Sequence, residues 1–316
     1  MLITLVLFAA GLAILVAGAE SLVRGSSSLA LRLGISPLVV GLTVVAFGTS
    51  SPELAVSVDS SLRGSSSIAL GNVVGSNIAN IALILGLTAL IRPMLVQRSL
   101  IVAQIPFMIA TSCLLWLLLL DNSLGFADGL LMFLGLVAYI YASYRCSRNQ
   151  APAESVELLP GDVATLQDKI WFCLLLIVLG LAALIGGGIM LVDAAVELAR
   201  IFNVDETIIG LTIVAIGTSM PELATSVVAA IRKQSDLALG NVVGSNIFNS
   251  LGILGIASMI TPLASVGFSQ VDFAVMVAFA AILLPMCMTR RKLDRLEGLI
   301  LLSGYLAYMV YIWPEV

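Results

Sequence analysis

Long apolar runs, separated mostly by short polar connections, fill this chain of 316 residues. Each run is roughly 20 residues or longer, which is the length at which an α-helix crosses the hydrocarbon core of a bilayer. The pattern therefore predicts an all-α membrane protein with ten transmembrane helices. We expect these helices near residues 2–31, 36–62, 68–91, 99–120, 124–145, 170–200, 205–231, 236–260, 268–289 and 296–313.

The connection at 146–169 is longer and more polar than the others, and it contains Pro152 and Pro160. It is too short to form a folded domain of its own. We interpret it as a linker between a first half, 1–145, and a second half, 170–316, each with five predicted helices.

The two halves carry the same motifs at the same spacing. The sequence GTSxPE begins at Gly48 and again at Gly217, and the sequence GNVVGSNI begins at Gly71 and again at Gly240, so that each pair is 169 residues apart. Five predicted helices, an odd number, separate equivalent points, and the halves must therefore be inverted in the membrane. Inverted repeats with interrupted helices are typical of secondary transporters, whose sites lie near the middle of the bilayer.

Lysine and arginine residues indicate the orientation of the chain. Of the 15 Lys and Arg residues, 13 lie in or beside the odd-numbered connections, and only Arg63 and Arg200 lie in even-numbered ones. Because cytoplasmic loops are enriched in basic residues, we expect the odd connections, including 146–169, in the cytoplasm and both termini outside. The prediction is a multi-pass protein of the cytoplasmic (inner) membrane.

Composition excludes several classes of function. The chain is 60% hydrophobic and 11% charged, which is typical of proteins with many membrane spans. It has no histidine, which excludes His-based catalytic triads, HExxH zinc sites and His proton relays. Its four cysteines are scattered without the spacing of a metal site. Nothing favours nucleic-acid binding, and we predict no enzymatic activity, no resident cofactor and no obligate protein partner.

Each GTSxPE motif places an acid within a predicted span, at Glu53 and Glu222. Acids within the membrane are costly and usually functional. The preceding Pro52 and Pro221 remove a backbone N–H and should interrupt each helix, and free carbonyls, hydroxyls and a carboxylate suit Ca²⁺ or Na⁺. The alternative is structural, because serine three residues before glutamate also forms a capping box at a helix start.

The second motif adds neutral oxygens. Asn72, Ser76 and Asn80 recur every four residues and should share one helical face, and Asn241, Ser245 and Asn249 repeat the pattern in the second half. Hydrogen bonding between helices is the structural alternative for this face. If the halves pack together, the two glutamates share one centre, where two carboxylates balance one Ca²⁺ or several Na⁺ ions.

Both motifs, in order and in both halves, resemble the repeats of the calcium/cation antiporter superfamily, and the chain is most similar to its prokaryotic Na⁺/Ca²⁺ exchangers. The specific motifs occupy 36–91 and 205–260. The resemblance implies the Na⁺/Ca²⁺ exchanger fold and alternating access, in which the first and sixth spans move against the rest. It also implies which residues bind the cations. The central ligands are the acids Glu53 and Glu222 and the amides Asn80 and Asn249, and Ser76 and Ser245 complete outer Na⁺ sites. Further ligands are the hydroxyl or carbonyl oxygens of Thr49, Ser50, Thr218 and Ser219 and the backbone carbonyls of Ala46 and Ala215.

The chain departs from part of that superfamily at Asn249, where some prokaryotic members carry aspartate. We predict a secondary active antiporter that expels Ca²⁺ as Na⁺ enters, with Ca²⁺, Na⁺ and the lipid bilayer as its partners. The same glutamates could instead carry protons in a cation/H⁺ antiporter, which the missing third acid disfavours. A cation channel and an intramembrane protease are further alternatives, which the inverted repeats and the absence of histidine, respectively, argue against.

Overall fold

The structure is a computed structural model that describes residues 1–148, 169–202, 215–265 and 269–312. Most of the predicted linker at 146–169 lies outside the described residues. So does the start of the predicted seventh span, together with the first ten residues of the motif region 205–260.

Eight helical stretches among the described residues are long and apolar enough to cross a bilayer. They are Leu2–Leu33, Ser66–Ile91, Leu100–Asp121, Phe126–Cys146, Ile170–Ile201, Ser235–Ile260, Gln270–Arg291 and Arg295–Ile312. The pair Pro37–Thr49 and Ser51–Leu62, bent by 46° at a break, passes the same test only when the two helices are taken together, and it makes a ninth stretch if it is counted as one span. Eight of the ten predicted spans thus correspond to such stretches, the predicted span at 36–62 corresponds to the bent pair, and the one predicted at 205–231 begins outside the described residues.

The chain forms two compact units, and each unit takes segments from both halves of the sequence. The first unit comprises residues 1–52 and 142–241, and the second comprises residues 53–141 and 242–316. The core of a unit is therefore built from both repeats.

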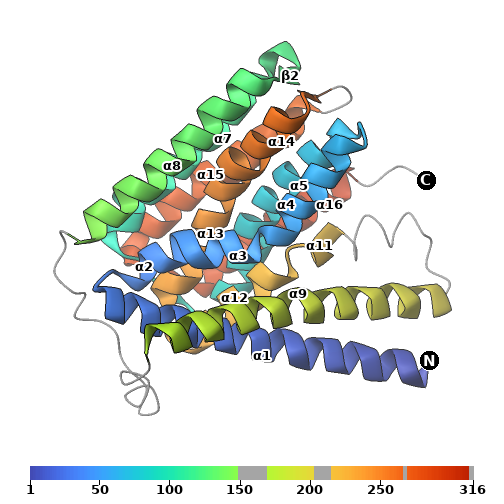
Figure 1. The fold of residues 1–316 in the computed structure, drawn as a ribbon, viewed down its shortest axis with the longest axis vertical. Coiled ribbons are helices and arrows are strands. Elements are labelled where there is room, and N and C mark those ends of the chain that lie inside the picture. Colours follow the sequence, from blue (N-terminus) through green and yellow to red (C-terminus); the bar gives the residue numbers. More distant parts are fainter. Residues whose placement is uncertain (149–168, 203–214, 266–268, 313–316) are drawn as a thin grey trace. The chain divides into compact units, whose positions relative to one another are not determined.

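The first unit is dominated by two antiparallel helices, α1 (Leu2–Leu33) and α9 (Ile170–Ile201), which lie side by side in Figure 1. Glycines recur at every seventh position along their contact, at Gly11, Gly18 and Gly25 on α1 and at Gly180 and Gly187 on α9. A Cβ atom on Gly18 would lie 2.7 Å from the backbone nitrogen of Leu184. Small residues allow this approach of two backbones, which replaces a hydrophobic driving force inside a membrane.

Replacing Gly187 by leucine is expected to destabilise the protein by about 3 kcal/mol, the upper end of the usual cost of overpacking. The reason is that a Cβ atom there would lie 2.6 Å from the backbone nitrogen of Leu15, and a backbone cannot yield as a side chain can. Thermal aggregation of the purified variant, followed by size-exclusion chromatography, measures the loss. The adjacent Gly186 is the matched control, because its Cβ position has no heavy atom within 4 Å. Equal stability of the two leucine variants would contradict this packing.

The first unit also contains the elements around the GTSxPE motifs. They are α2 (Pro37–Val40), a π-helical segment Gly41–Val45, α3 (Ala46–Thr49), α11 (Ala215–Gly217), α12 (Met220–Ile231) and the start of α13 (Ser235–Phe248). A Cβ atom on Gly240 of α13 would lie 2.7 Å from the carbonyl oxygen of Leu38. Backbone contact therefore fixes the helix before the first motif against the second motif of the other repeat.

The second unit consists of helices from both halves. They are most of α4 (Ser51–Leu62), α5 (Ser66–Ala79), α6 (Gly86–Ile91), α7 (Ile105–Leu118), most of α8 (Phe126–Arg148), the end of α13, α14 (Leu254–Ile260), α15 (Gln270–Met288) and α16 (Arg295–Ile312). Three π-helical segments interrupt them, at Asn80–Leu85, Leu100–Gln104 and Asn249–Ile253.

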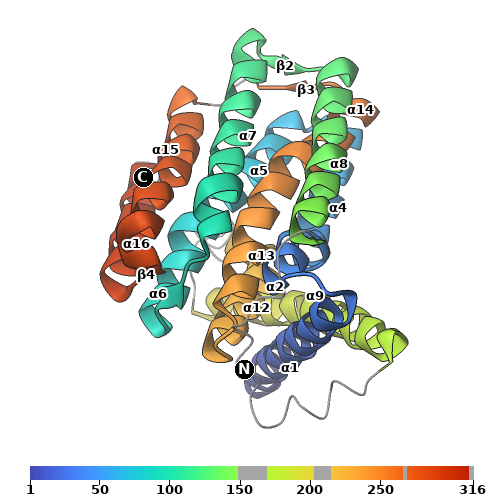
Figure 2. The same cartoon turned by 90° about the vertical axis from the view of Figure 1, so that its left-hand side faces the viewer.

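Two short antiparallel ladders join connections of the second unit. β1 (Met94–Leu95) pairs with β4 (Lys292–Leu293), and β2 (Ser123–Leu124) pairs with β3 (Leu263–Ala264), as Figure 2 shows for the latter. The first ladder joins the third and ninth predicted connections, and the second joins the fourth and eighth. Two connections that are hydrogen-bonded to each other must lie on the same side of a membrane. Each ladder joins two odd-numbered or two even-numbered connections, as the predicted topology requires.

Candidate cation site

Both GTSxPE motifs interrupt their helices at a serine. Ser50 separates α3 from α4 with φ −83° and ψ 9°, and Ser219 precedes α12 with φ −89° and ψ 9°. Pro221 lies in the first turn of α12, where its missing N–H costs nothing. The predicted interruption of both helices is confirmed, and the serine at each break has nearly the same φ and ψ.

The acid of the second repeat meets the break of the first repeat inside the first unit. Glu222, in the first turn of α12, is 1% exposed, and its Oε1 atom accepts a hydrogen bond of 2.9 Å from the hydroxyl of Ser50. Its Oε2 atom is buried and has no hydrogen-bond partner within the described residues. Leaving a buried carboxylate oxygen unsatisfied is costly, so this atom is suited to a cation.

The capping alternative is wrong for Ser219, because its side chain does not cap α12. In the first repeat, the hydroxyl of Ser50 donates its hydrogen to the carboxylate of the other repeat. A polar contact between residues 172 positions apart is a tertiary interaction, which a local capping motif does not require.

An asparagine supports the turn that carries each acid. In the first unit, Asn241 Nδ2 donates to the carbonyl of Glu222 at 3.4 Å and to the hydroxyl of Ser226 at 3.1 Å. In the second unit, Asn72 Nδ2 donates to the carbonyl of Glu53 at 3.0 Å and to Ser57 at 2.9 Å. The same three residues, shifted by 169 positions, therefore hold both acidic turns.

Thr49 joins the acidic turn of the second repeat to the first motif. Its hydroxyl donates to Asn241 Oδ1 at 3.1 Å, and both groups are buried. Asn241 is thus fixed at both ends of its carboxamide, by Thr49 at the oxygen and by the Glu222 turn at the nitrogen.

Two of the predicted neutral ligands in the second unit lie where their helices change pitch. Asn80 and Asn249 each begin a π-helical segment, a feature that is frequent at functional sites. Both residues are 1% exposed. Their side-chain Oδ1 atoms, and the hydroxyl of Ser245, are buried without a hydrogen-bond partner among the residues that the structure describes. These three oxygens are therefore available to a cation.

Residues 3–145 and 172–313 match the family described as sodium/calcium exchanger protein. The chain belongs to the sodium/calcium exchanger family. It is 35% identical to the inner membrane protein YrbG of Escherichia coli strain K12, over 99% of this chain and 98% of the relative. It is 32% identical to the sodium/calcium exchanger MaX1 of Methanosarcina acetivorans, over 96% of each.

The structure of the sodium-calcium exchanger NCX_Mj soaked with 10 mM Na⁺ and zero Ca²⁺ is similar to this one, with a TM-score of 0.84 and 30% sequence identity. The similarity covers 99% of this chain and 100% of that chain. The predicted all-α exchanger fold and the resemblance to prokaryotic Na⁺/Ca²⁺ exchangers are confirmed.

The predicted ligands of this exchanger are distributed over both compact units. In the first unit lie Ala46, Thr49, Ser50, Ala215, Thr218, Ser219 and Glu222, and in the second lie Glu53, Ser76, Asn80, Ser245 and Asn249. All of them are buried except Thr218, which is half-buried, and Ala215, whose side chain lies outside the described atoms. The carbonyl of Ala46 already accepts hydrogen bonds from the backbone of Ser50 at 3.0 Å and from the hydroxyl of Thr49 at 3.4 Å.

Sequence reasoning missed Ser57 and Ser226 as supports of the acidic turns, and it left Asn77 and Asn246 unassigned. The sequence did contain a signal for them, because Ser57 recurs as Ser226 and Asn77 recurs as Asn246, each at the repeat offset of 169 residues. Within the described residues, no group of three or more His, Cys, Asp or Glu side chains lies together.

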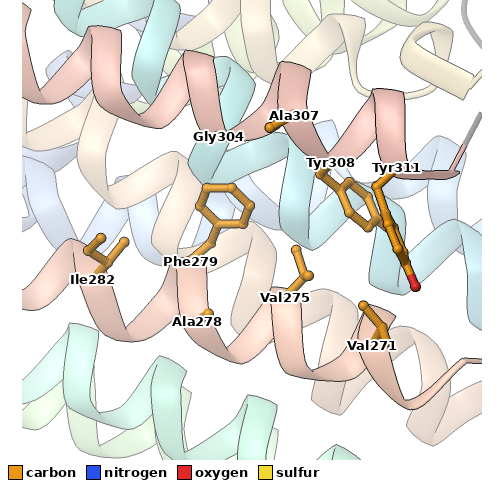
Figure 3. Close-up of a pocket in the computed structure, with 9 residues that line it drawn as sticks. All are labelled: Val271, Val275, Ala278, Phe279, Ile282, Gly304, Ala307, Tyr308 and Tyr311. Atoms are coloured by element: carbon orange, nitrogen blue, oxygen red, sulfur yellow. The ribbon is translucent and has the colours of Figure 1, made fainter.

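A groove of about 390 Å³ between α15 and α16 has a different character (Figure 3). Aliphatic and aromatic side chains such as Val275, Phe279 and Ile282 line it. The hydroxyl of Tyr308 at this groove donates to Asp272 at 2.8 Å. The groove lies on two helices that are apolar enough to span a membrane. Its lining is mostly hydrocarbon and is therefore unsuited to a cation such as Ca²⁺, which needs oxygen ligands.

Proposed function

We propose that the protein is a secondary active antiporter that exchanges Ca²⁺ for Na⁺ by alternating access and moves Ca²⁺ out of the cell. The observation that carries the proposal is the buried carboxylate of Glu222 at an interrupted apolar helix. One of its oxygens accepts a hydrogen bond from Ser50, and the other has no hydrogen-bond partner among the described residues. The names of the relatives, an inner membrane protein and two sodium/calcium exchangers, support it.

The proposed ligands for the transported ions are the twelve residues named above. The repeat in the sequence supports assigning both glutamates to the same ions, since Glu53 and Glu222 occupy equivalent positions. Two carboxylates balance the charge of one Ca²⁺, and neutral hydroxyl and amide oxygens can serve Na⁺ as well as Ca²⁺. Transport by this mechanism needs no resident cofactor and no catalytic residue.

Competition between the ions supplies the coupling in this proposal. A ligand shifts a conformational equilibrium only by the difference between its affinities for the two states. An exchanger therefore changes sides when Ca²⁺ or Na⁺ occupies its site and not when the site is empty. A net leak of either ion is thereby prevented.

Uptake of ⁴⁵Ca²⁺ into proteoliposomes loaded with Na⁺ tests the proposal. Uptake is expected with internal Na⁺ and should vanish when choline replaces it. Uptake driven equally well by a pH gradient without Na⁺ would instead show a cation/H⁺ antiporter. Ca²⁺ flux that needs no counter-ion would show a channel.

Both termini are proposed to lie outside the cell. A cysteine introduced at Ser123, on the fourth connection, is expected to react with an impermeant maleimide in whole cells. A cysteine at Leu95, on the third connection, is expected to stay unlabelled until the membrane is permeabilised. Both side chains are exposed in the structure, and the four native cysteines would first be replaced. The reverse labelling pattern would overturn the orientation that the basic residues predict.

A further inference from the structure

Four buried asparagines form one hydrogen-bonded network inside the second unit. Asn77 and Asn80 lie at the junction of α5 with its π-helical segment, and Asn246 and Asn249 lie at the equivalent junction after α13. Their exposed fractions are 2% or less. The network therefore joins the two repeats at the residues where both helices change their pitch.

Asn80 and Asn249, the two proposed ligands in this network, each donate one amide hydrogen to an asparagine of the other repeat that is not a proposed ligand. Asn80 Nδ2 donates to Asn246 Oδ1 at 3.0 Å, and Asn249 Nδ2 donates to Asn77 Oδ1 at 3.2 Å. The network continues beyond these pairs. Asn246 Nδ2 donates to the backbone carbonyl of Asn77 at 3.2 Å, and Asn77 Nδ2 donates to the hydroxyl of Ser250 at 3.0 Å.

The carboxamides of Asn77 and Asn246 each have a second, weaker acceptor. Asn77 Nδ2 lies 3.7 Å from the sulfur of Met276, and Asn246 Nδ2 lies 3.7 Å from the sulfur of Met108. The Nδ2 group of Asn77 and that of Asn246 therefore each have two acceptors. The Oδ1 atoms of the same two side chains face Asn249 and Asn80, respectively.

This pattern determines which end of each proposed ligand is available. A carboxamide carries an acceptor oxygen and a donor nitrogen of nearly equal size, and its hydrogen bonds decide which end points where. Asn80 and Asn249 use their nitrogen within the network. Their Oδ1 atoms are both buried and lack a hydrogen-bond partner within the described part of the chain. An oxygen attracts a cation, whereas an NH₂ group in the same place would repel it.

We propose that Asn77 and Asn246 are positioning residues for cation binding, which hold the amide oxygens of Asn249 and Asn80 toward the transported ion. The inference rests on the proposed function and deepens it. Without Asn77, the carboxamide of Asn249 loses the acceptor that fixes its nitrogen. The amide can then flip, which exchanges the positions of its oxygen and its nitrogen. The same relation connects Asn246 to Asn80.

Equilibrium binding of ⁴⁵Ca²⁺ to the purified full-length protein in detergent tests the assignment. Asn77→Leu and Asn246→Leu replace each carboxamide by an apolar group of similar size. Each is expected to weaken the apparent Ca²⁺ affinity by about tenfold, which is the effect of losing one buried hydrogen-bond partner. Wild-type protein that binds no Ca²⁺ would defeat the proposed function, and this inference with it.

Double-mutant cycles separate positioning from packing. Asn77→Leu should have little further effect in an Asn249→Ala background, where the group that it positions is gone, and should keep its full effect in an Asn80→Ala background. Asn246→Leu should show the opposite dependence. Two outcomes would contradict the inference, provided that the wild-type protein binds Ca²⁺. Either the leucine variants bind Ca²⁺ as tightly as the wild type, or the effects of the paired substitutions add in all four cycles. The asparagines would then serve only in packing.

A milder variant keeps the test informative if a leucine variant does not elute as monodisperse protein. Ser250→Ala removes the hydroxyl that accepts from Asn77 Nδ2 and leaves all four asparagines in place. It is expected to weaken Ca²⁺ binding about threefold, and to do so only while Asn249 is present. An unchanged affinity, or the same loss in the Asn249→Ala background, would contradict the inference.

Discussion

Replacement of Glu222 by glutamine is expected to abolish Ca²⁺ exchange. The substitution keeps the size of the side chain but removes one of two negative charges that the proposed function assigns to one Ca²⁺. Removing one partner from a buried ion pair costs about 3–5 kcal/mol. That cost corresponds to a loss of more than about a hundredfold in binding. Na⁺-dependent ⁴⁵Ca²⁺ uptake into proteoliposomes measures the loss.

The repeat supplies a second variant, and α4 supplies a control. Glu53→Gln should be as severe as Glu222→Gln, because the two acids occupy equivalent positions and an asparagine holds both turns in the same way. Asp59→Asn also removes one acid from α4, but its side chain is 59% exposed and pairs with Arg63 at 2.7 Å. It should therefore retain exchange. Appreciable Ca²⁺ uptake by either glutamine variant would reject the shared two-carboxylate site.

The sequence allowed the helix interruptions to be predicted because their cause is local. Pro52 and Pro221 each remove a backbone donor, and the same break follows in both repeats. The contact that each broken helix makes with the other repeat does not have a local cause. The hydrogen bond between Ser50 and Glu222 depends on which helices pack together, and hydrophobic periodicity does not encode that choice. For the same reason, the halves defined by the linker differ from the two compact units, which each combine helices from both halves.

The asparagine network was beyond prediction for a geometric reason. The face formed by Asn72, Ser76 and Asn80 assumes a straight α-helix, and Asn77 lies about 100° away from that face. The π-helical segment that begins at Asn80 changes the helical pitch at this residue. No residue type marks the start of such a segment as proline marks a break. The exact recurrence of Asn77 as Asn246 was visible, but recurrence alone does not distinguish a ligand from a residue that positions one.

Transport is expected to respond to membrane voltage, and only one of its two half-cycles should do so. A site with two carboxylates and one Ca²⁺ is neutral, so the Ca²⁺-loaded carrier should cross without moving net charge. With three Na⁺ in place of one Ca²⁺, the same site carries about one positive charge. Moving one charge through the membrane is worth about 2.3 kcal/mol per 100 mV. At equilibrium this changes the Ca²⁺ gradient about 50-fold per 100 mV.

Potentials set with K⁺ and valinomycin across proteoliposomes measure this dependence. An inside-negative potential should promote Na⁺ entry and Ca²⁺ exit, and exchange that ignores the potential would reject a cycle of three Na⁺ per Ca²⁺. The net charge moved in a full cycle depends only on the stoichiometry, whereas the charge of the site decides which half-cycle carries it. Exchange of ⁴⁵Ca²⁺ for Ca²⁺ in the absence of Na⁺ isolates the Ca²⁺ half-cycle and serves as the internal control. Its rate should not change with potential if Glu53 and Glu222 are the only charges of the site, and a voltage-dependent rate would contradict that charge.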